Sequence, residues 1–212
     1  LMGRWDQNME VRGRIWFDGA QKDADSLRAL AGHGISLVPQ GVGNLDPLMR
    51  VGEQVRGAAR GATGEARRAD AERRAVRQRE LFLAYGLDPQ VERMYPHELS
   101  GGMARRVLLM CALMDEPRLI IADEPTPGLD LDLRGFADAG GGVLLITHDI
   151  ELALRVADRV AVFSDGTIVE ETGVESFSSA DTLRHPFSRA LWRAMPGREF
   201  AVAAGAAREG DK

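Results

Sequence analysis

Lysine, cysteine and long apolar runs are all scarce in this chain of 212 residues. Its 27 basic residues include only two lysines, Lys22 and Lys212, so almost every positive charge is an arginine. A single cysteine, Cys111, excludes an internal disulfide and fits a reducing compartment. No apolar stretch approaches the roughly 18 residues that a membrane-spanning helix requires. We therefore expect any membrane role to be peripheral, through a partner that supplies the spanning helices.

The overall charge and apolar content narrow the class of protein further. A net charge of -5 argues against general nucleic-acid binding, which usually needs a basic face. Apolar residues make up 44% of the chain, as in ordinary soluble proteins. The length suits one globular unit or a core with a small subdomain. Cys111 lies among apolar neighbours, so we interpret it as a small buried hydrophobe.

Short apolar runs alternate with helical patterns, which favours an α/β fold with a mostly parallel sheet. Two of these runs, 119–122 and 143–147, are apolar throughout except for Thr147 at the end of the second. We therefore expect both to form strands that are covered on both faces. A helix is predicted from Met103, where apolar residues recur at helical spacing, and Pro117 closes it. The predicted strands are 35–38, 119–122 and 143–147, followed by a helix near 150–157 and a hairpin of 160–163 with 167–169.

Two further segments have a clear local pattern. Residues 9–19 alternate as in a half-exposed strand, with a turn at Asp18-Gly19. Residues 57–80 contain seven arginines and four acids, and the helix that they start is expected to end at Gly86. This arginine-rich segment could be a basic docking surface or a solvated helix face with i,i+4 ion pairs. We favour the second interpretation because the acids are interleaved.

A serine and two glycines open the helix that begins near Met103. Ser100, Gly101 and Gly102 leave backbone N–H groups bare at a helix start, where the helix dipole favours an anion. By itself this pattern is more often an ordinary capped turn.

Two adjacent acids, Asp123 and Glu124, end the apolar strand at 119–122. Ligands bind at the carboxyl ends of strands in α/β folds, and neighbouring side chains on a strand point to opposite sides. The two carboxylates can therefore have different tasks. The alternative is a pair of surface acids before a turn proline, Pro125.

Two other polar residues follow predicted strands. His148 comes after the run 143–147, and Gln40 comes after the run 35–38. His148 could contact a phosphate or polarise Glu124, although a lone histidine is more often structural. Gln40 could contact a metal ion or water, although a loop glutamine usually has no such role.

In order and spacing, these motifs resemble those of an ATP-binding cassette (ABC) ATPase over about residues 10–195. The resemblance implies a P-loop NTPase-like α/β fold, with a helical subdomain that carries the signature loop Leu99-Ser100-Gly101-Gly102-Met103. In this family two cassettes enclose two ATP molecules, and each signature loop caps the ATP held by the other cassette. Mg²⁺ is the expected second cofactor.

The resemblance also implies a role for each candidate residue. Asp123 is the Walker B acid that holds Mg²⁺, and Glu124 is the base that activates water. His148 is the switch histidine, and Asp130 is the D-loop acid. Gln40 is the Q-loop residue, which contacts Mg²⁺ or water. Ser100, Gly101 and Gly102 contact ATP bound to the partner cassette.

Three segments are similar to importers of oligopeptides, dipeptides and nickel, in particular to the first ATPase of a nickel importer. They are 44–48, 96–103 and 185–191. The resemblance implies a second ATPase subunit, a transmembrane permease and, indirectly, an extracytoplasmic substrate-binding protein as partners. It places the chain on the cytoplasmic face of the membrane, with no nucleic-acid partner. The expected parts are an N-terminal core remnant with the Q-loop (1–52), a helical subdomain (53–102), a core with Walker B and the switch histidine (103–175) and a C-terminal extension (176–212).

The chain departs from the family pattern in three places. The phosphate-binding sequence G-x-x-x-x-G-K-[ST] (Walker A) does not occur in these residues, so we expect the N-terminal P-loop portion of the fold to be missing and ATP affinity to be low. The segment 131–142 is short and glycine-rich, and Pro127-Gly128 replaces the usual D-loop residues. Besides an importer ATPase, the sequence therefore allows a non-hydrolysing accessory cassette that lends only its signature loop. A third hypothesis is a cassette protein of DNA repair or translation. It is disfavoured because repair members carry long coiled coils and translation members carry two cassettes, and neither pattern appears in this sequence.

Overall fold

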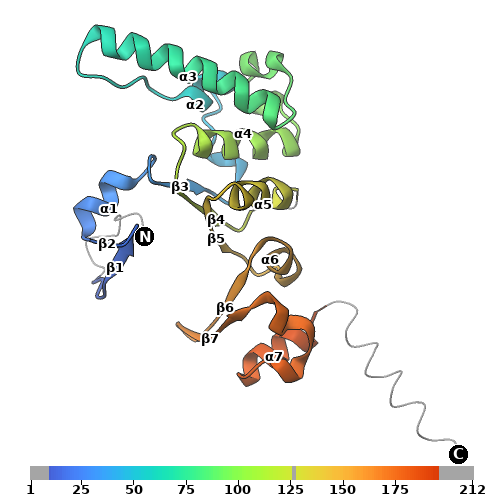
Figure 1. Cartoon of the computed structure of the whole chain (residues 1–212). Coiled ribbons are helices and arrows are strands. Elements are labelled where there is room, and N and C mark those ends of the chain that lie inside the picture. The colour runs from blue at the N-terminus through green and yellow to red at the C-terminus, as the bar shows by residue number, and fades with distance from the viewer. Residues whose placement is uncertain (1–9, 126–127, 196–212) are drawn as a thin grey trace, which may run out of the picture. The chain divides into compact units, whose positions relative to one another are not determined.

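The computed structural model describes residues 10–125 and 128–195. They form two compact units, one within residues 1–146 and one within 147–212 (Figure 1). The helices and strands of the first unit are β1 (Ile15–Phe17), β2 (Ala20–Lys22), α1 (Ala24–Leu30), β3 (Ile35–Val38), α2 (Val51–Arg56), α3 (Gly64–Ala84), α4 (Gly101–Leu113), β4 (Leu119–Asp123), α5 (Asp130–Asp138) and β5 (Gly142–Ile146), with short 3-10 turns at Val42–Asn44, Pro89–Arg93 and Pro96–Glu98. The four-part division expected from the motifs stays a prediction, because these units are defined on a coarser scale.

A parallel sheet in the order β3-β4-β5 forms the centre of the first unit. Val38 of β3 lies opposite Ala122 of β4, and Ala122 lies opposite Leu145 of β5. The middle strand β4 is almost wholly buried, as its apolar run predicts. The predicted α/β class with a mostly parallel sheet is confirmed.

A small antiparallel hairpin and α1 cover one end of this sheet. Leu27 of α1 packs between Ile35 and Ile121, and Phe17 of β1 adds to the same cluster. The predicted turn at Asp18-Gly19 is present, with both residues at positive φ. The strand predicted over 9–19 was too long, because only Ile15–Phe17 pairs with β2. Residue 9 lies outside the described part of the chain.

The prediction that β5 is covered on both faces was wrong. Leu144 and Ile146 point to one face and are 38% and 48% exposed. Among the described residues β5 pairs only with β4, so it is an edge strand. An apolar run tells a strand from a loop, but it does not tell an edge strand from a central one.

Three helices, α2, α3 and α4, pack against one another, and α4 also contacts β3 of the sheet (Figure 1). Val51 and Val55 of α2 and Val107 of α4 are buried. Helix α4 begins at the predicted glycines and ends four residues before Pro117. Helix α3 ends before Gly86, whose φ of 62° is a conformation that glycine adopts without strain.

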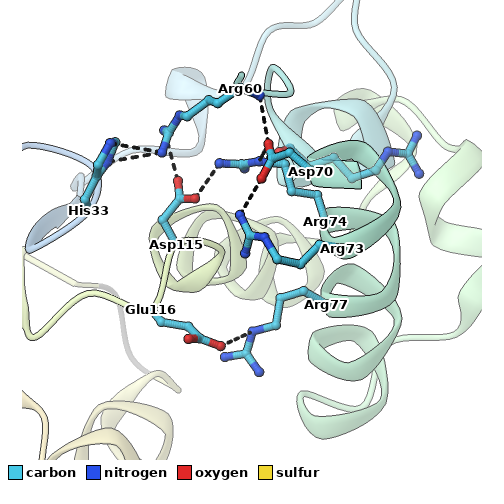
Figure 2. A network of polar contacts seen from close by, with 9 residues as sticks. His33, Arg60, Asp70, Arg73, Arg74, Arg77, Asp115 and Glu116 are labelled. Atoms are coloured by element: carbon cyan, nitrogen blue, oxygen red, sulfur yellow. Dashed lines mark hydrogen bonds and ion pairs between the residues drawn. The ribbon is translucent and has the colours of Figure 1, made fainter. Parts of the chain in front are cut away.

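A network of charged side chains joins α3 to the connection between α4 and β4 (Figure 2). Arg74 of α3 is only 3% exposed. Its guanidinium donates to Asp70 at 3.0 Å, to Asp115 and to the carbonyl of Arg56 at 2.6 Å. Arg60 donates to Asp115 at 3.1 Å, and its backbone N–H donates to Asp70 at 2.8 Å.

This network corrects the interpretation of α3 as a solvated face. A predicted i,i+4 ion pair within the helix is present between Asp70 and Arg74 at 3.0 Å, and Asp70 also pairs with Arg73, three residues on, at 2.6 Å. Arg74 and Gln78 are nevertheless buried, so one side of the arginine-rich helix is an internal surface. A buried arginine is tolerated because three acceptors surround it.

The second unit contains α6 (Ile150–Val156), a hairpin of β6 (Arg159–Ser164) and β7 (Thr167–Gly173), short 3-10 turns at Val174–Ser178 and Ala180–Thr182, and α7 (Pro186–Arg193). The predicted hairpin and the helix near 150–157 are confirmed. Val162, Phe177 and Leu183 form its core. No helix of the described residues is both long and apolar enough to cross a bilayer.

The family-like segment 185–191 is held at its start by a buried acid. Glu170 of β7 accepts backbone hydrogen bonds from Arg184 at 2.8 Å and His185 at 3.0 Å. The His185 ring then accepts from the N–H of Phe187 at 3.2 Å. The bonds to Glu170 fix the backbone before the helix, and the bond from Phe187 satisfies a donor that the helix start leaves without an intrahelical partner. The His-Pro sequence therefore works here as a helix entry.

Candidate functional site

The signature-like loop lies at the N-terminus of α4. The Ser100 hydroxyl accepts a hydrogen bond from the N–H of Met103 at 3.3 Å and thereby caps the helix. Ser100, Gly101 and Gly102 are all exposed, and added Cβ atoms at the two glycines would meet nothing within 4 Å. The loop therefore presents the start of a 13-residue helix to the surface, with free space above the glycines.

The segment before this loop is held by residues that sequence reasoning missed. The N–H of Tyr95 donates to Glu98 at 2.7 Å, and the Tyr95 ring stacks on His97. The guanidinium of Arg50 lies 5.4 Å from the Tyr95 ring centre and donates to the Arg93 carbonyl at 3.1 Å. Arg50 directly precedes α2, so it ties the loop after β3 to the loop before α4. A separation of more than forty residues left no local sequence signal for this contact.

Asp123 and Glu124 lie at the carboxyl end of β4, as predicted. Asp123 is the last strand residue and is exposed, whereas Glu124 is half-buried. The N–H of Glu124 donates to the carbonyl of Ile146 in β5 at 2.8 Å. Glu124 has a φ of 45°, which is uncommon for a residue with a side chain. The two acids therefore leave the strand in different local conformations.

Gln40 belongs to the same edge of the sheet. It follows β3 by two residues, is exposed, and β3 is the direct neighbour of β4. The loop after it is fixed by Gln54, which accepts from the N–H of Asp46 at 2.8 Å and donates to the carbonyls of Asp46 and Met49. The structure thus brings Gln40, Asp123 and Glu124 to one side of the first unit.

The chemistry of this edge fits a magnesium ion that also binds a nucleotide. Mg²⁺ keeps several waters and takes one or two protein oxygens together with substrate phosphates. The Asp123 carboxylate and the Gln40 amide are donors of this kind. Within the described residues no group of three or more His, Cys, Asp or Glu side chains is arranged to hold a metal by itself. A metal here would therefore depend on the phosphates for most of its ligands.

The remaining candidates lie further along the chain. Asp130 is the first residue of α5 and is half-buried. The short segment after it still forms a helix of nine residues, although three glycines follow. Pro127, one of the two atypical D-loop residues, lies outside the described residues.

His148 belongs to the second unit and is exposed there. It lies directly before Asp149, whose side chain accepts from the N–H of Leu152 at 2.9 Å and caps α6. The cap fixes the backbone next to His148.

Comparison with known proteins identifies the family. The family model described as ABC transporter matches residues 5–127. The chain is 31% identical to an oligopeptide transport ATP-binding protein of Lactococcus lactis over 94% of this chain and 62% of the relative. It is 35% identical to a putative peptide import ATP-binding protein of Brucella melitensis over 84% of this chain and 55% of the relative. The chain thus spans between half and two thirds of the length of these relatives.

A solved structure has the same fold. It is a dimeric post-hydrolysis state of an ATP-binding cassette bound to ADP and phosphate, with a TM-score of 0.60 and 28% identity over 77% of this chain and 74% of that chain. The family match covers more than half of the present sequence and contains β3, α4 and β4 with the Gln40, Ser100 and Asp123 positions. By this match and this fold, the chain belongs to the ABC transporter family.

Proposed function

We propose that this chain is the ATP-binding subunit of a peptide importer and that it powers a membrane permease by closing on a second cassette around ATP. The observation that carries the proposal is the shared edge of β3 and β4, where Gln40, Asp123 and Glu124 follow neighbouring parallel strands. The peptide class of cargo is favoured over nickel because the relatives cited above are named for peptide transport.

In this proposal each acid has a separate task. Asp123 holds Mg²⁺ through water, and Glu124 orients and deprotonates the water that attacks the γ-phosphate. Gln40 contacts the metal or its water, and His148 contacts the γ-phosphate. The half-buried position and fixed backbone of Glu124 support its role as the base, because a base must be held in one orientation.

The signature loop acts on the other cassette. The exposed α4 N-terminus offers backbone N–H groups and open space at Gly101 and Gly102, which suits contact with a phosphate bound by a partner. Asp130 at the start of α5 belongs to the same proposed interface. The chain would bind the cytoplasmic side of its permease as a peripheral subunit, and the permease would receive cargo from an extracytoplasmic binding protein.

A Glu124→Gln variant in the assembled transporter tests the catalytic role. The substitution keeps the size of the side chain and removes the base, so ATP turnover should fall by at least about 100-fold. Glu151→Gln, at an exposed acid in the first turn of α6, is the matched control and should leave turnover unchanged. Unchanged turnover with Glu124→Gln would favour the alternative function, an accessory cassette that lends only its signature loop.

Ser100→Arg tests the contact in trans. Both Ser100→Arg and Ser100→Ala remove the same helix cap, which costs about 1 kcal/mol. Only the arginine adds bulk at the exposed loop. Loss of coupled hydrolysis with arginine but not with alanine is therefore the expected result, and the isolated chain should stay folded in both cases. Retained transport with Ser100→Arg would contradict the proposed capping.

A further inference from the structure

A groove of about 550 Å³ lies between α3 and α5 in the first unit, over the connection from α4 to β4. Its size is within the range of ligand-binding pockets. The residues assigned to nucleotide chemistry do not line it. Leu81 of α3 and Tyr85, which directly follows this helix, form one wall. Asp132 and Phe136 of α5 form the other, and Glu116 and Pro117 form part of the floor.

One of the carboxylates in the groove has no ion-pair partner among the described residues. Arg77 is the single cation of the lining, and it already faces Glu80 at 3.4 Å and Glu116 at 3.7 Å. Asp132 forms no hydrogen bond or ion pair with another side chain in the described part of the chain, and Arg106 of α4 acts on it only at longer range. With three carboxylates and one guanidinium, the groove carries a net negative charge.

Asp132 and Tyr85 face the same space from opposite walls. Burial raises the pKa of the Asp132 carboxyl, and the charge of Asp130 raises it further. Burial also raises the pKa of the Tyr85 phenol, and the negative charge of Asp132 adds to this effect. Both polar groups are thus partly removed from water, and each can still accept a hydrogen bond from a ligand.

One apolar side chain at the groove is strongly exposed. Leu131, in the first turn of α5, is 82% exposed, and Phe136, five residues further along the helix, lines the groove and is half-buried. An exposed leucine near an ionised carboxylate lets a peptide make an aliphatic contact with the first and an ionic contact with the second. A small cation alone would leave Leu131 uncovered.

We propose that this groove binds a short segment of a partner protein that places one arginine or lysine between Tyr85 and Asp132. The cation donates hydrogen bonds to the Asp132 carboxylate and lies against the Tyr85 ring, and aliphatic neighbours in the segment cover Leu131 and Phe136. Arginine is favoured because its planar head binds a carboxylate with two parallel bonds. The surface is separate from the proposed ATP site, so it would add a contact that ATP binding does not use.

The test uses the full chain and a blocked hexapeptide with one central arginine between leucines, measured by isothermal titration calorimetry. A second peptide with citrulline in place of arginine has nearly the same shape without the charge. The arginine peptide should bind at least about tenfold more tightly than the citrulline peptide. Equal affinity for the two peptides, or no binding at millimolar concentration, would overturn the proposal.

Variants locate the binding to the groove. Asp132→Asn should weaken binding of the arginine peptide about tenfold and leave the citrulline peptide unchanged. Leu131→Ser should weaken both peptides to a similar extent. Asp138→Asn, on the same helix but paired with Arg134 outside the groove, should change neither. Circular dichroism confirms that each variant is folded.

Two results would refute the proposed partner. If arginine amide alone bound as tightly as the hexapeptide, the groove would recognise a small cation and not a protein segment. If Asp132→Asn and Asp138→Asn had the same effect, the peptide would bind elsewhere.

Discussion

Replacing Arg74 by alanine should destabilise the first unit more than any other single change of an arginine in α3. Arg74 is 3% exposed and donates to two carboxylates and one carbonyl. Removing one member of a buried ion pair costs about 3–5 kcal/mol, because the remaining charge stays buried without its partner. Asp115 keeps Arg60, and Asp70 keeps Arg73. We therefore expect the lower end of this range, about 3 kcal/mol.

The matched control is Arg73→Ala, one position earlier on the same helix. The Arg73 side chain is 55% exposed and, within the described residues, pairs only with Asp70, so its loss should cost less than about 1 kcal/mol. Urea unfolding followed by far-ultraviolet circular dichroism measures both variants. With an m-value of about 2 kcal/mol/M, the midpoint should fall by about 1.5 M for Arg74→Ala and by less than about 0.5 M for Arg73→Ala. Equal shifts would refute the view that Arg74 is the centre of the network.

Three further predictions concern single residues of the first unit. The Arg60 N–H and the side chains of Arg73 and Arg74 donate hydrogen bonds to Asp70, and these bonds hold the pKa of its carboxyl well below the usual 3.8. The Asp70 carboxylate therefore stabilises the folded chain above pH 3.8, and this stabilisation is lost as the pH falls toward the lowered pKa. Melting temperatures between pH 5 and 3, relative to those of Asp70→Asn, measure this loss, and parallel curves would contradict it. Burial raises the pKa of the Cys111 thiol to about 12, so iodoacetamide at pH 8 should label only unfolded protein, and rapid labelling of the native chain would be inconsistent with this burial. Gly52→Ala should lower the free energy of unfolding by about 1–3 kcal/mol, because the added Cβ would lie 2.9 Å from the Cβ of Glu92. Gly64→Ala is the control in the same urea-unfolding measurement and should be nearly neutral, because its Cβ would meet nothing within 4 Å.

Local patterns in the sequence predicted the elements that carry the candidate site. Helix α4 starts at the glycines after Ser100, because the serine cap and the apolar spacing act within one or two turns. Strand β4 and the acid at its end were likewise readable from an apolar run followed by Asp123. The pairing of β3 with β4, which brings Gln40 to the same edge, was not predicted, because a preference for a parallel sheet leaves the order of its strands open.

Contacts between distant residues could not be predicted in this way. Arg74 and Asp115 are 41 positions apart, and nothing in the arginine-rich segment distinguishes the buried arginine from its exposed neighbours. The contact of Arg50 with Tyr95 and the hydrogen bonds that Glu170 accepts at the start of α7 could not be predicted for the same reason. Each depends on which surfaces meet in three dimensions.

The edge strand β5 has a practical consequence for handling this protein. Its sequence Gly-Val-Leu-Leu-Ile contains no charge and no proline, and its outer backbone groups pair with no strand among the described residues. Such an edge is a template on which another chain can add as a further strand, and natural proteins usually protect it with lysine, proline or a covering segment. Purified material should therefore precipitate at rising concentration, and a single Leu144→Lys change on the exposed face should raise its solubility without altering its fold.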